Sequence, residues 1–312
     1  MLISKTIKRV TVLASASLIC ASLLGNSTTF ASEKLSIEEK RSAVHQAYGL
    51  SEDWVNDLID EDLQYYYDGI SELVTSSVDE NYFKLEEVYD YTLATPDNGY
   101  SPLQIVDTNV SEVSKQEAME QSNNKDNGIT TMGASTTTTS WLKLETSNEK
   151  YSTSQGGASA RFEWLKTPTQ KQKDVLALGT NSNMSVIPGT ASNVFKYTYL
   201  DQINPSKVIQ KTNNPVAFQS VLGYAYEMQL PQVNDGNSPS HPDYARNIIG
   251  YMKYRYTPNV STLTKADIYA KYGHNITILN SSLSVDIKGT AGISIGPASK
   301  TMEVYNHNQI SW

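Results

Sequence analysis

The chain has 312 residues, a formal net charge of −8 and a single cysteine. One cysteine excludes an internal disulfide and a metal site built from several thiolates. Nucleic acid is not an expected partner, because an acidic chain repels phosphate.

Residues 1–31 have the pattern of a secretory signal peptide. Three basic residues precede an apolar run over 10–24, and small or polar residues lead to a predicted cleavage between Ala31 and Ser32. The run is shorter than the roughly 18–20 residues of a membrane-spanning helix, and no later segment approaches that length. We therefore expect a secreted, extracellular protein without a stable transmembrane segment, from which Cys20 has been removed.

Residues 32–94 predict a small acidic helical segment. Ser36 and Glu39 have the spacing of a capping box at the start of a first helix. Ser51 and Asp68 are in position to cap a second and a third helix. The segment is expected to form a small bundle or hairpin.

Charge separates this segment from the rest of the chain. Residues 32–100 carry 17 Asp and Glu against 4 Lys and Arg, whereas residues 128–312 carry 11 against 16, so the two parts should attract each other. A cluster of carboxylates in the acidic part invites a calcium hypothesis, but it lacks the glycine and the spacing of a calcium loop. We interpret it as a solvated acidic face. The cluster comprises Asp57, Asp60, Glu61, Asp62 and Asp68.

Residues 95–139 predict a flexible linker. The turn sequence TPDNG and the polar stretches QSNNKDNG and ASTTTTS cannot bury enough apolar area to offset chain entropy. The first interpretation is an ordinary interdomain connection. The alternative is a protease site at which the acidic segment is removed as a pro-segment, by a cut between residues 100 and 140.

Residues 140–312 predict a tyrosine-rich β domain. Side chains alternate between apolar and polar from Ser140 onward, and turn residues separate short apolar runs. Only residues 264–272 have a helical pattern. The predicted fold class is α+β: a small N-terminal helical segment followed by a mostly antiparallel β-sandwich or barrel-like domain. The first two predicted strands form a hairpin over residues 141–146 and 160–164, and further strands are predicted over residues 175–178, 194–200, 223–230, 248–256, 283–288, 293–295 and 302–312.

The stretches RFEWLKTP, KDVLALG and VFKYTY resemble a pattern in secreted proteins of Gram-positive bacteria such as bacilli and clostridia. The resemblance covers about residues 140–200. Its matching positions here are Arg161, Trp164, Asp174 and Tyr197. The resemblance implies a location and a fold, and it implies no activity for any of these residues.

Enzymatic chemistry has little support in the sequence. The motifs of serine hydrolases, zinc proteases and phosphate-binding loops do not occur, which makes a non-enzyme the favoured interpretation. A glycan hydrolase stays open as a third function, because it needs only two carboxylates brought together by the fold. His241 and Asp243 lie in one polar loop and are the candidate metal ligands; beyond them we expect neither a metal nor another cofactor.

Tyrosine is abundant, with 20 residues against 5 phenylalanines. Tyr251, Lys253 and Arg255 alternate along one predicted strand and are the best candidates for an exposed binding face, joined by Tyr197 and Tyr199. We expect a non-catalytic protein that binds an anionic wall polymer, a glycan or an extracellular protein at the cell envelope, with noncovalent wall association. The alternative is that the tyrosines fill and rim the sandwich.

A pore-forming toxin with a removable acidic pro-segment is the alternative function. In the stretch SSLSVDIKGTAGISIGP, Leu283, Val285 and Ile287 alternate with Ser284 and Asp286, and the isoleucines of the second half alternate with serine and glycine. A β-hairpin that inserts into a membrane has this pattern, and so do the strands of many sandwiches.

Overall fold

The computed structural model describes residues 35–90, 104–123, 130–132, 135–168, 173–200, 207–212, 214–231, 244–276, 284–288, 292–296 and 301–312. Its helices are α1 (Ile37–Tyr48), α2 (Glu52–Asp57), α3 (Asp60–Gly69), the 3-10 turn η1 (Ile70–Glu72) and α4 (Lys115–Ser122). Its strands are β1 (Thr75–Asp90), β2 (Gln104–Val113), β3 (Thr130–Met132), β4 (Ser135–Lys150), β5 (Gly156–Lys166), β6 (Lys173–Thr180), β7 (Met184–Val186), β8 (Ser192–Leu200), β9 (Lys207–Thr212), β10 (Val216–Ser220), β11 (Gly223–Gln229), β12 (Tyr244–Pro258), β13 (Lys265–Asn275), β14 (Ser284–Lys288), β15 (Gly292–Gly296) and β16 (Thr301–Ser311).

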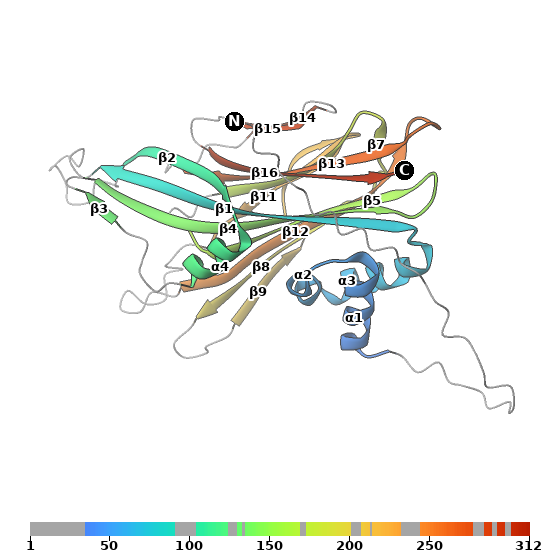
Figure 1. Ribbon diagram of the computed structural model, residues 1–312, viewed down its shortest axis with the longest axis horizontal. Helices are drawn as coiled ribbons and strands as arrows, with labels where there is room; N and C mark the ends of the chain where they lie inside the picture. The colour runs from blue at the N-terminus through green and yellow to red at the C-terminus, as the bar shows by residue number, and fades with distance from the viewer. Residues whose placement is uncertain are drawn as a thin grey trace, which may run out of the picture.

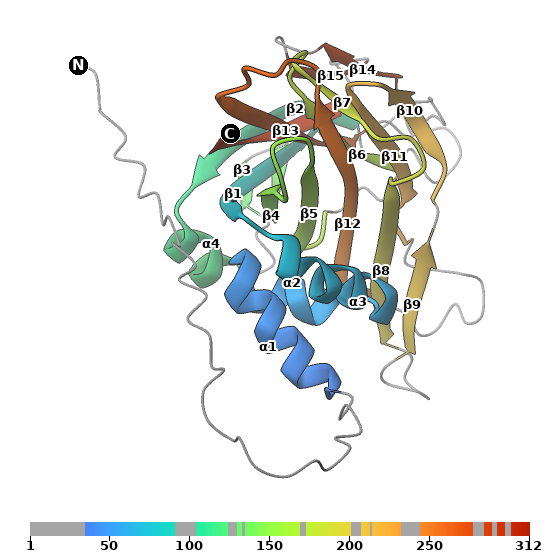
Figure 2. The same ribbon diagram turned by 90° about the vertical axis from the view of Figure 1, so that its right-hand side faces the viewer.

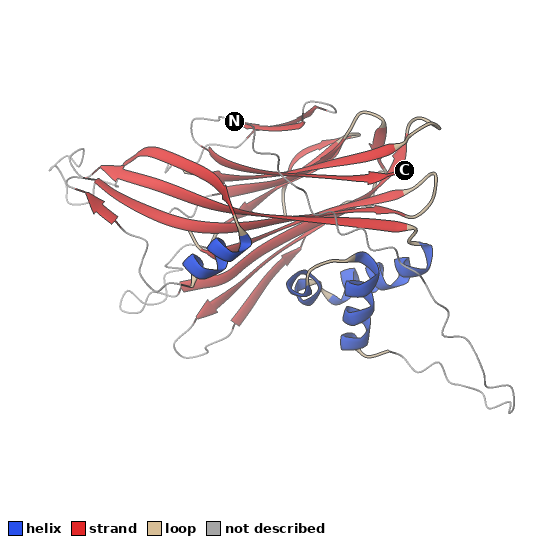
Figure 3. Cartoon of the chain, in the orientation of Figure 1, coloured by secondary structure: helices blue, strands red, loops and turns tan. Residues whose placement is uncertain are grey.

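Two antiparallel sheets pack face to face, which confirms the predicted fold class (Figure 1). The large sheet has the order β2-β1-β4-β5-β12-β8-β9, with β3 beside β4 and β7 beside β12. The small sheet has the order β10-β11-β6-β13-β16. Figure 3 shows that helices α1 to α3 lie together on one side of the strands, while the separate hairpin β14-β15 lies on the other side.

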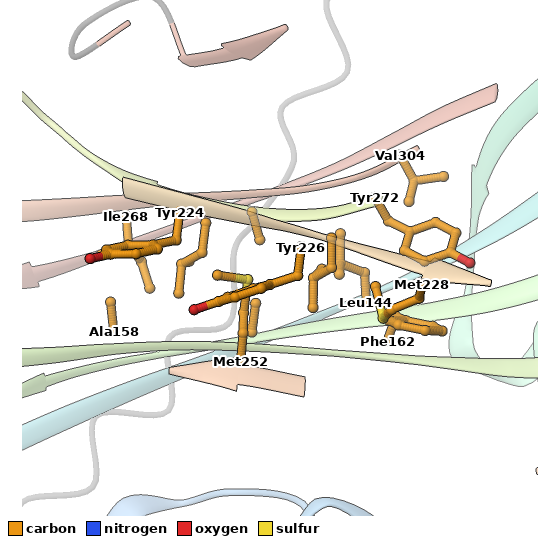
Figure 4. Close-up of a cluster of buried hydrophobic side chains, with 14 of the residues drawn as sticks. Leu144, Ala158, Phe162, Tyr224, Tyr226, Met228, Met252, Ile268, Tyr272 and Val304 are labelled. Atoms are coloured by element: carbon orange, nitrogen blue, oxygen red, sulfur yellow. The ribbon is translucent and has the colours of Figure 1, made fainter. Parts of the chain in front are cut away.

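The main core fills the space between the two sheets, and tyrosines supply much of it. Tyr224 and Tyr226 of β11 project from the small sheet onto Met252 and neighbouring side chains of the large sheet (Figure 4). Tyr254 and Tyr256 of β12 are also buried in this cluster. For these four residues, the alternative that tyrosines fill the sandwich is confirmed.

Asparagines join the two sheets along β16. The side-chain amide of Asn308 donates to the backbone carbonyls of Ser77 (2.8 Å) and Thr146 (3.2 Å), which belong to β1 and β4. Asn306 donates in the same way to the carbonyl of Leu144 at 3.1 Å. These bonds cross from the edge of the small sheet to the large sheet, where no backbone ladder connects them.

The structure differs from the expected helical segment and linker. The predicted third helix does not form: α3 begins at Asp60, and the chain becomes strand β1 at Thr75. Residues 104–113 and 115–122, expected in the linker, form β2 and α4. Strand β1 pairs with β4 from Thr75 to Asp90. Local composition could not predict this strand, because β1 depends on a partner that lies far along the chain. A cut between residues 100 and 140 would therefore leave the helices joined to β1, which stays paired with β4 in the large sheet.

Residues 264–272 were expected to be helical and instead belong to β13. Ala266, Ile268, Ala270 and Tyr272 occupy every second position and point into the main core. Partners on both sides, β6 and β16, stabilise the strand. Small residues are compatible with a helix, and the tertiary contacts decide otherwise.

We predict that Asn308→Leu lowers the free energy of unfolding by about 1–3 kcal/mol, because two buried carbonyls lose a donor. Urea denaturation would measure the loss. Ser311→Ala is the matched control, since Ser311 is exposed in the same strand. Equal stability of the two variants would contradict a connecting role for Asn308.

Candidate functional site

Residues 37–72 form a lid of helices α1 to α3 and η1 over the outer face of the large sheet (Figure 2). The lid has a small core largely of its own, to which the sheet domain adds Tyr151, Val194 and Tyr251. The buried lid residues in this core are Val44, Tyr48, Leu50, Trp54, Val55, Leu58, Leu63 and Tyr66.

Local signals explain where the lid helices begin. Ser36 and Glu39 form the predicted capping box of α1, and the Ser51 hydroxyl accepts from the amide of Trp54 at the start of α2. Helix α3 follows Ile59, which has no side-chain oxygen for capping. The Ile59 amide instead donates to the hydroxyl of Tyr251 at 3.1 Å, so a residue of β12 helps to position α3.

The outer side chains of β4, β5, β8 and β12 beneath the lid form what we call the charged face. At its centre Arg161 is 1% exposed. Its guanidinium contacts Glu145 (2.5 Å) and Glu163 (3.0 Å) of the sheet, and Nε donates to Asp57 of the lid at 3.0 Å. A lid carboxylate thus completes the set of partners around a buried cation.

The predicted binding residues Tyr251, Lys253 and Arg255 lie on this face, under the lid. Lys253 Nζ is 3.1 Å from Asp62, and the Tyr251 hydroxyl donates to the same carboxylate at 2.8 Å. Arg255 donates to the hydroxyl of Tyr65 at 2.9 Å. Tyr251 is 3% exposed and Lys253 7%, so the prediction of an exposed face is wrong for both. The acidic helices, whose attraction to the β domain the charges predicted, cover it.

The acidic cluster is not a uniformly solvated face. Asp62 is buried, and Asp57 contacts Arg161 across the lid boundary, so that interpretation is wrong for these two residues. Lys196 adds to the contact by donating to the backbone carbonyl of Asp57. Within the described parts of the chain, no group of three or more His, Cys, Asp or Glu side chains could hold a metal ion. His241 and Asp243 lie outside the described residues.

The two remaining candidates belong to β8, and Tyr197 does not extend the charged face. Tyr197 is 7% exposed and points into the main core, where its ring lies 5.5 Å from that of Phe195. Tyr199 pairs with Ala245 in the strand register, and its side chain lies outside the described residues. The structure therefore separates Tyr197 from Tyr251 and Lys253.

Burial beneath the lid changes the acid–base behaviour of the charged face. Loss of solvent raises the pKa of Glu149 to about 7, although hydrogen bonds from Ser147 and Ser159 and the charges of Arg255 and Lys253 oppose the rise. Burial also raises the pKa of Asp57 above its usual range, against the opposing charge of Arg161. The closed lid therefore holds ionisable groups that water would solvate well.

A second polar cluster lies inside the sandwich, around His274. Its Nδ1 is 3.0 Å from Asp174, and its Nε2 is 3.5 Å from Glu87 of the other sheet. Tyr272 donates to Asp174 and accepts from Trp164 Nε1 at 2.9 Å. All five side chains are at most 3% exposed, so the cluster connects the sheets and presents no surface to a substrate.

The positions that carry the family resemblance fall into three places. Trp164 and Asp174 meet in the His274 cluster, Arg161 lies at the centre of the charged face, and Tyr197 lies in the main core. Sequence reasoning missed His274 as their partner. Spacing could not reveal it, because β13 lies far along the chain from β5 and β6.

The hairpin β14-β15 is the second candidate site. Its register pairs Ile287 with Ile293 and Asp286 with Ser294. Ile287, Ile293 and Ile295 are buried against Val175 and other outer residues of the small sheet, whereas Asp286 and Ser294 are exposed. The hairpin forms a two-stranded sheet of its own, so side-chain packing is its described contact with the sandwich.

Glycines leave room for the hairpin on the small sheet, and we call the outer residues of the small sheet that contact the hairpin its seat. A Cβ atom on Gly179 would lie 2.7 Å from Ile287, and one on Gly273 would lie 2.8 Å from Ile295. Both distances are too short for ordinary packing. The isoleucines therefore contact the sheet at positions where any larger residue would displace them.

No protein-family model matches the chain, and no curated protein matches it. Among solved structures it is similar to Clostridium perfringens delta-toxin, with 11% identity and a TM-score of 0.28 over 59% of this chain and 88% of that chain. For the Clostridium perfringens NetB toxin in its membrane-inserted form the identity is 8% and the TM-score 0.24, over 56% of this chain and 91% of that chain. For the T6 backbone pilin of serotype M6 Streptococcus pyogenes the identity is 6% and the TM-score 0.28, over 75% of this chain and 63% of that chain. Similarity this low establishes neither a common fold nor a common activity.

The His274 cluster predicts a pH dependence of stability. Burial alone would lower the pKa of His274, but the charges of Asp174 and Glu87 and their hydrogen bonds outweigh it and raise the pKa to about 9. The stabilisation is fully present below the unfolded value of about 6.5 and is lost as pH rises through 9, a change of about 3 kcal/mol. Denaturant unfolding between pH 6 and pH 10 would measure it.

His274→Gln is the matching variant for this prediction. It should be less stable at pH 6, because two buried carboxylates lose their cation, and its free energy of unfolding should no longer fall between pH 6.5 and pH 9. A fall of the same size in the variant would show that another group titrates.

Proposed function

We propose that the protein is secreted and acts at a lipid bilayer, into which the β14-β15 hairpin inserts. The carrying observation is the amphipathic hairpin, which has one apolar and one polar face and shares no backbone ladder with the sandwich. Non-catalytic binding through Tyr251 and Lys253 is less well supported, because the closed lid leaves both residues buried.

The sequence around the hairpin supports a membrane-spanning length. Transmembrane β-strands need about 9–11 residues, whereas β14 and β15 have five each. Before β14, Leu279 and Leu283 have the same parity as Val285 and Ile287, with Ser281 as a polar interruption between the two leucines. Extended in this way, the hairpin would place its apolar side chains in lipid and Asp286 on the aqueous side.

Release of the hairpin is compatible with the rest of the fold. Among the described residues, the hairpin contacts the small sheet through side chains, so the sandwich ladders stay intact when it leaves. The seat that it uncovers includes the small side chains of Ala177 and Ala225 as well as Val175. No helix in the described parts of the chain is long and apolar enough to cross a bilayer.

A pore would require several copies of the chain. The smallest bacterial outer-membrane barrels have about eight strands, and each hairpin supplies two, so at least about four copies would have to combine. A single inserted hairpin would leave unpaired backbone groups in lipid, which is costly. Membrane activity should therefore depend steeply on protein concentration.

We predict that a disulfide between the hairpin and its seat abolishes membrane activity reversibly. The variant carries Gly273→Cys and Ile295→Cys in a Cys20→Ser background, at a contact where a Cβ atom on Gly273 would lie 3.2 Å from Cγ2 of Ile295. Leakage of dye from vesicles of equal parts phosphatidylcholine and phosphatidylglycerol should slow by about tenfold or more when the disulfide is oxidised. A reductant should restore the rate of the unmodified chain.

Ile295→Cys alone, in the same Cys20→Ser background, is the control, because it introduces one thiol without crowding Gly273, and its leakage should not respond to the reductant. No leakage with the unmodified chain at any concentration, or leakage unaffected by the oxidised disulfide, would contradict insertion of this hairpin. A normal unfolding midpoint of the reduced double variant would show that the substitutions leave the sandwich folded.

A further inference from the structure

The charged face has the composition of a solvated sheet surface although the lid covers it. Outer positions of β4, β5, β8 and β12 carry ionisable side chains, including Lys143, Glu145, Glu149, Arg161, Lys196 and Lys253. Antiparallel sheets usually alternate in this way when one face meets water. The outer face of the small sheet is different, because it presents Val175, Ala177 and Ala225 to the hairpin.

The contact between the lid and the charged face has a polar part, and beside it an apolar part in which Val194 and Tyr251 join the core of the lid. Most of the lid's apolar side chains pack against one another, as described above, and the lid meets the charged face through Asp57, Asp62, Tyr65 and Tyr66. Trp54 Nε1 is fully buried and has no hydrogen-bond partner among the described residues. Water would solvate the charges of both surfaces, so separation costs less than it would for an apolar contact.

The contacts of the lid indicate which chemical groups the charged face binds. One carboxylate, Asp57, contacts Arg161, and a second, Asp62, contacts Lys253 and Tyr251. The two sites lie on neighbouring strands, because Arg161 and Tyr251 are direct partners in the register.

An aromatic ring completes the set of contacts. Lys253 Nζ lies 3.7 Å from the centre of the Tyr65 ring, and the guanidinium of Arg255 lies 5.2 Å from it. Cations above an aromatic face attract it, most strongly where solvent is excluded. A ligand with carboxylates alone would lose these contacts.

We propose that the charged face is a binding site for an acidic protein segment that carries an aromatic side chain, and that the lid occupies this site until such a segment displaces it. The ligand supplies two carboxylates to Arg161 and Lys253 and a ring to Lys253 and Arg255. A wall polymer or other polyanion supplies charge without the ring, and the aromatic contacts therefore favour a protein segment over a polymer. This site is separate from the membrane hairpin on the opposite side of the sandwich.

The test uses the full chain with the lid contacts weakened by Asp57→Asn and Asp62→Asn. The probe is a labelled peptide of residues 51–72, which supplies the original acidic surface in trans. It should bind this variant about tenfold or more tightly than it binds the unmodified chain, whose own lid competes. Asp53→Asn is the control chain, because the Asp53 side chain is 65% exposed and makes only a weak contact with the sheet, at 4.0 Å from Lys143 Nζ.

Three further measurements give the result its meaning. A peptide with both aspartates replaced by asparagine should bind about tenfold more weakly, and so should a peptide with Tyr65→Ala. Poly-glutamate of similar length should compete poorly. Hydrogen exchange should accelerate in residues 37–72 of the weakened variant and stay slow in β13, which shows an open lid on a folded sandwich.

Several results would overturn the proposal. Unchanged exchange in residues 37–72 would mean that these ion pairs do not hold the lid. Faster exchange without peptide binding would mean that the uncovered face accepts no such segment. Equal binding of the acidic and asparagine peptides, or strong competition by poly-glutamate, would exclude the proposed recognition. None of these measurements involves a membrane, so they are independent of the vesicle assay.

Discussion

Successive side chains of a strand point to opposite faces of its sheet, and this alternation determines how every layer of the molecule is built. The inner residues of both sheets form one core, rich in tyrosine and closed along β16 by asparagine side chains that reach the other sheet. The outer residues must then meet water or a covering element. Among the described residues, the lid, helix α4 and the hairpin cover outer side chains of the sheets.

The two largest coverings use opposite physical chemistry. The hairpin contacts its sheet through isoleucines. If the hairpin moves away, these isoleucines become exposed to water unless another apolar medium surrounds them. The lid contacts its sheet through ion pairs and hydrogen bonds that water can replace. This difference fits the two proposals, in which lipid receives the hairpin and an aqueous ligand of matching charge binds the face beneath the lid.

The sequence predicted the parts of the fold that depend on local pattern. Capping at Ser36 and Ser51, the antiparallel sheets and the shared face of Tyr251, Lys253 and Arg255 are all present. Burial of that face could not be predicted, because an alternating strand looks the same whether water or a lid meets its polar side. Charge imbalance predicted attraction between the two parts and could not assign Asp57 to Arg161 or Asp62 to Lys253.

The lid is joined to β1 through Leu73 and Val74, and β1 is paired with β4 along its whole length and with β2 from Tyr82 to Asp90. This attachment fixes the effective concentration of the lid at the charged face. A short tether holds a binding segment at an effective concentration of about millimolar, whatever the dilution of the protein. A free competitor must therefore bind much more tightly than the lid, or be displayed at high local density, as on a surface that carries many copies. The attachment thus acts as a threshold that separates dense arrays of acidic segments from dilute ones.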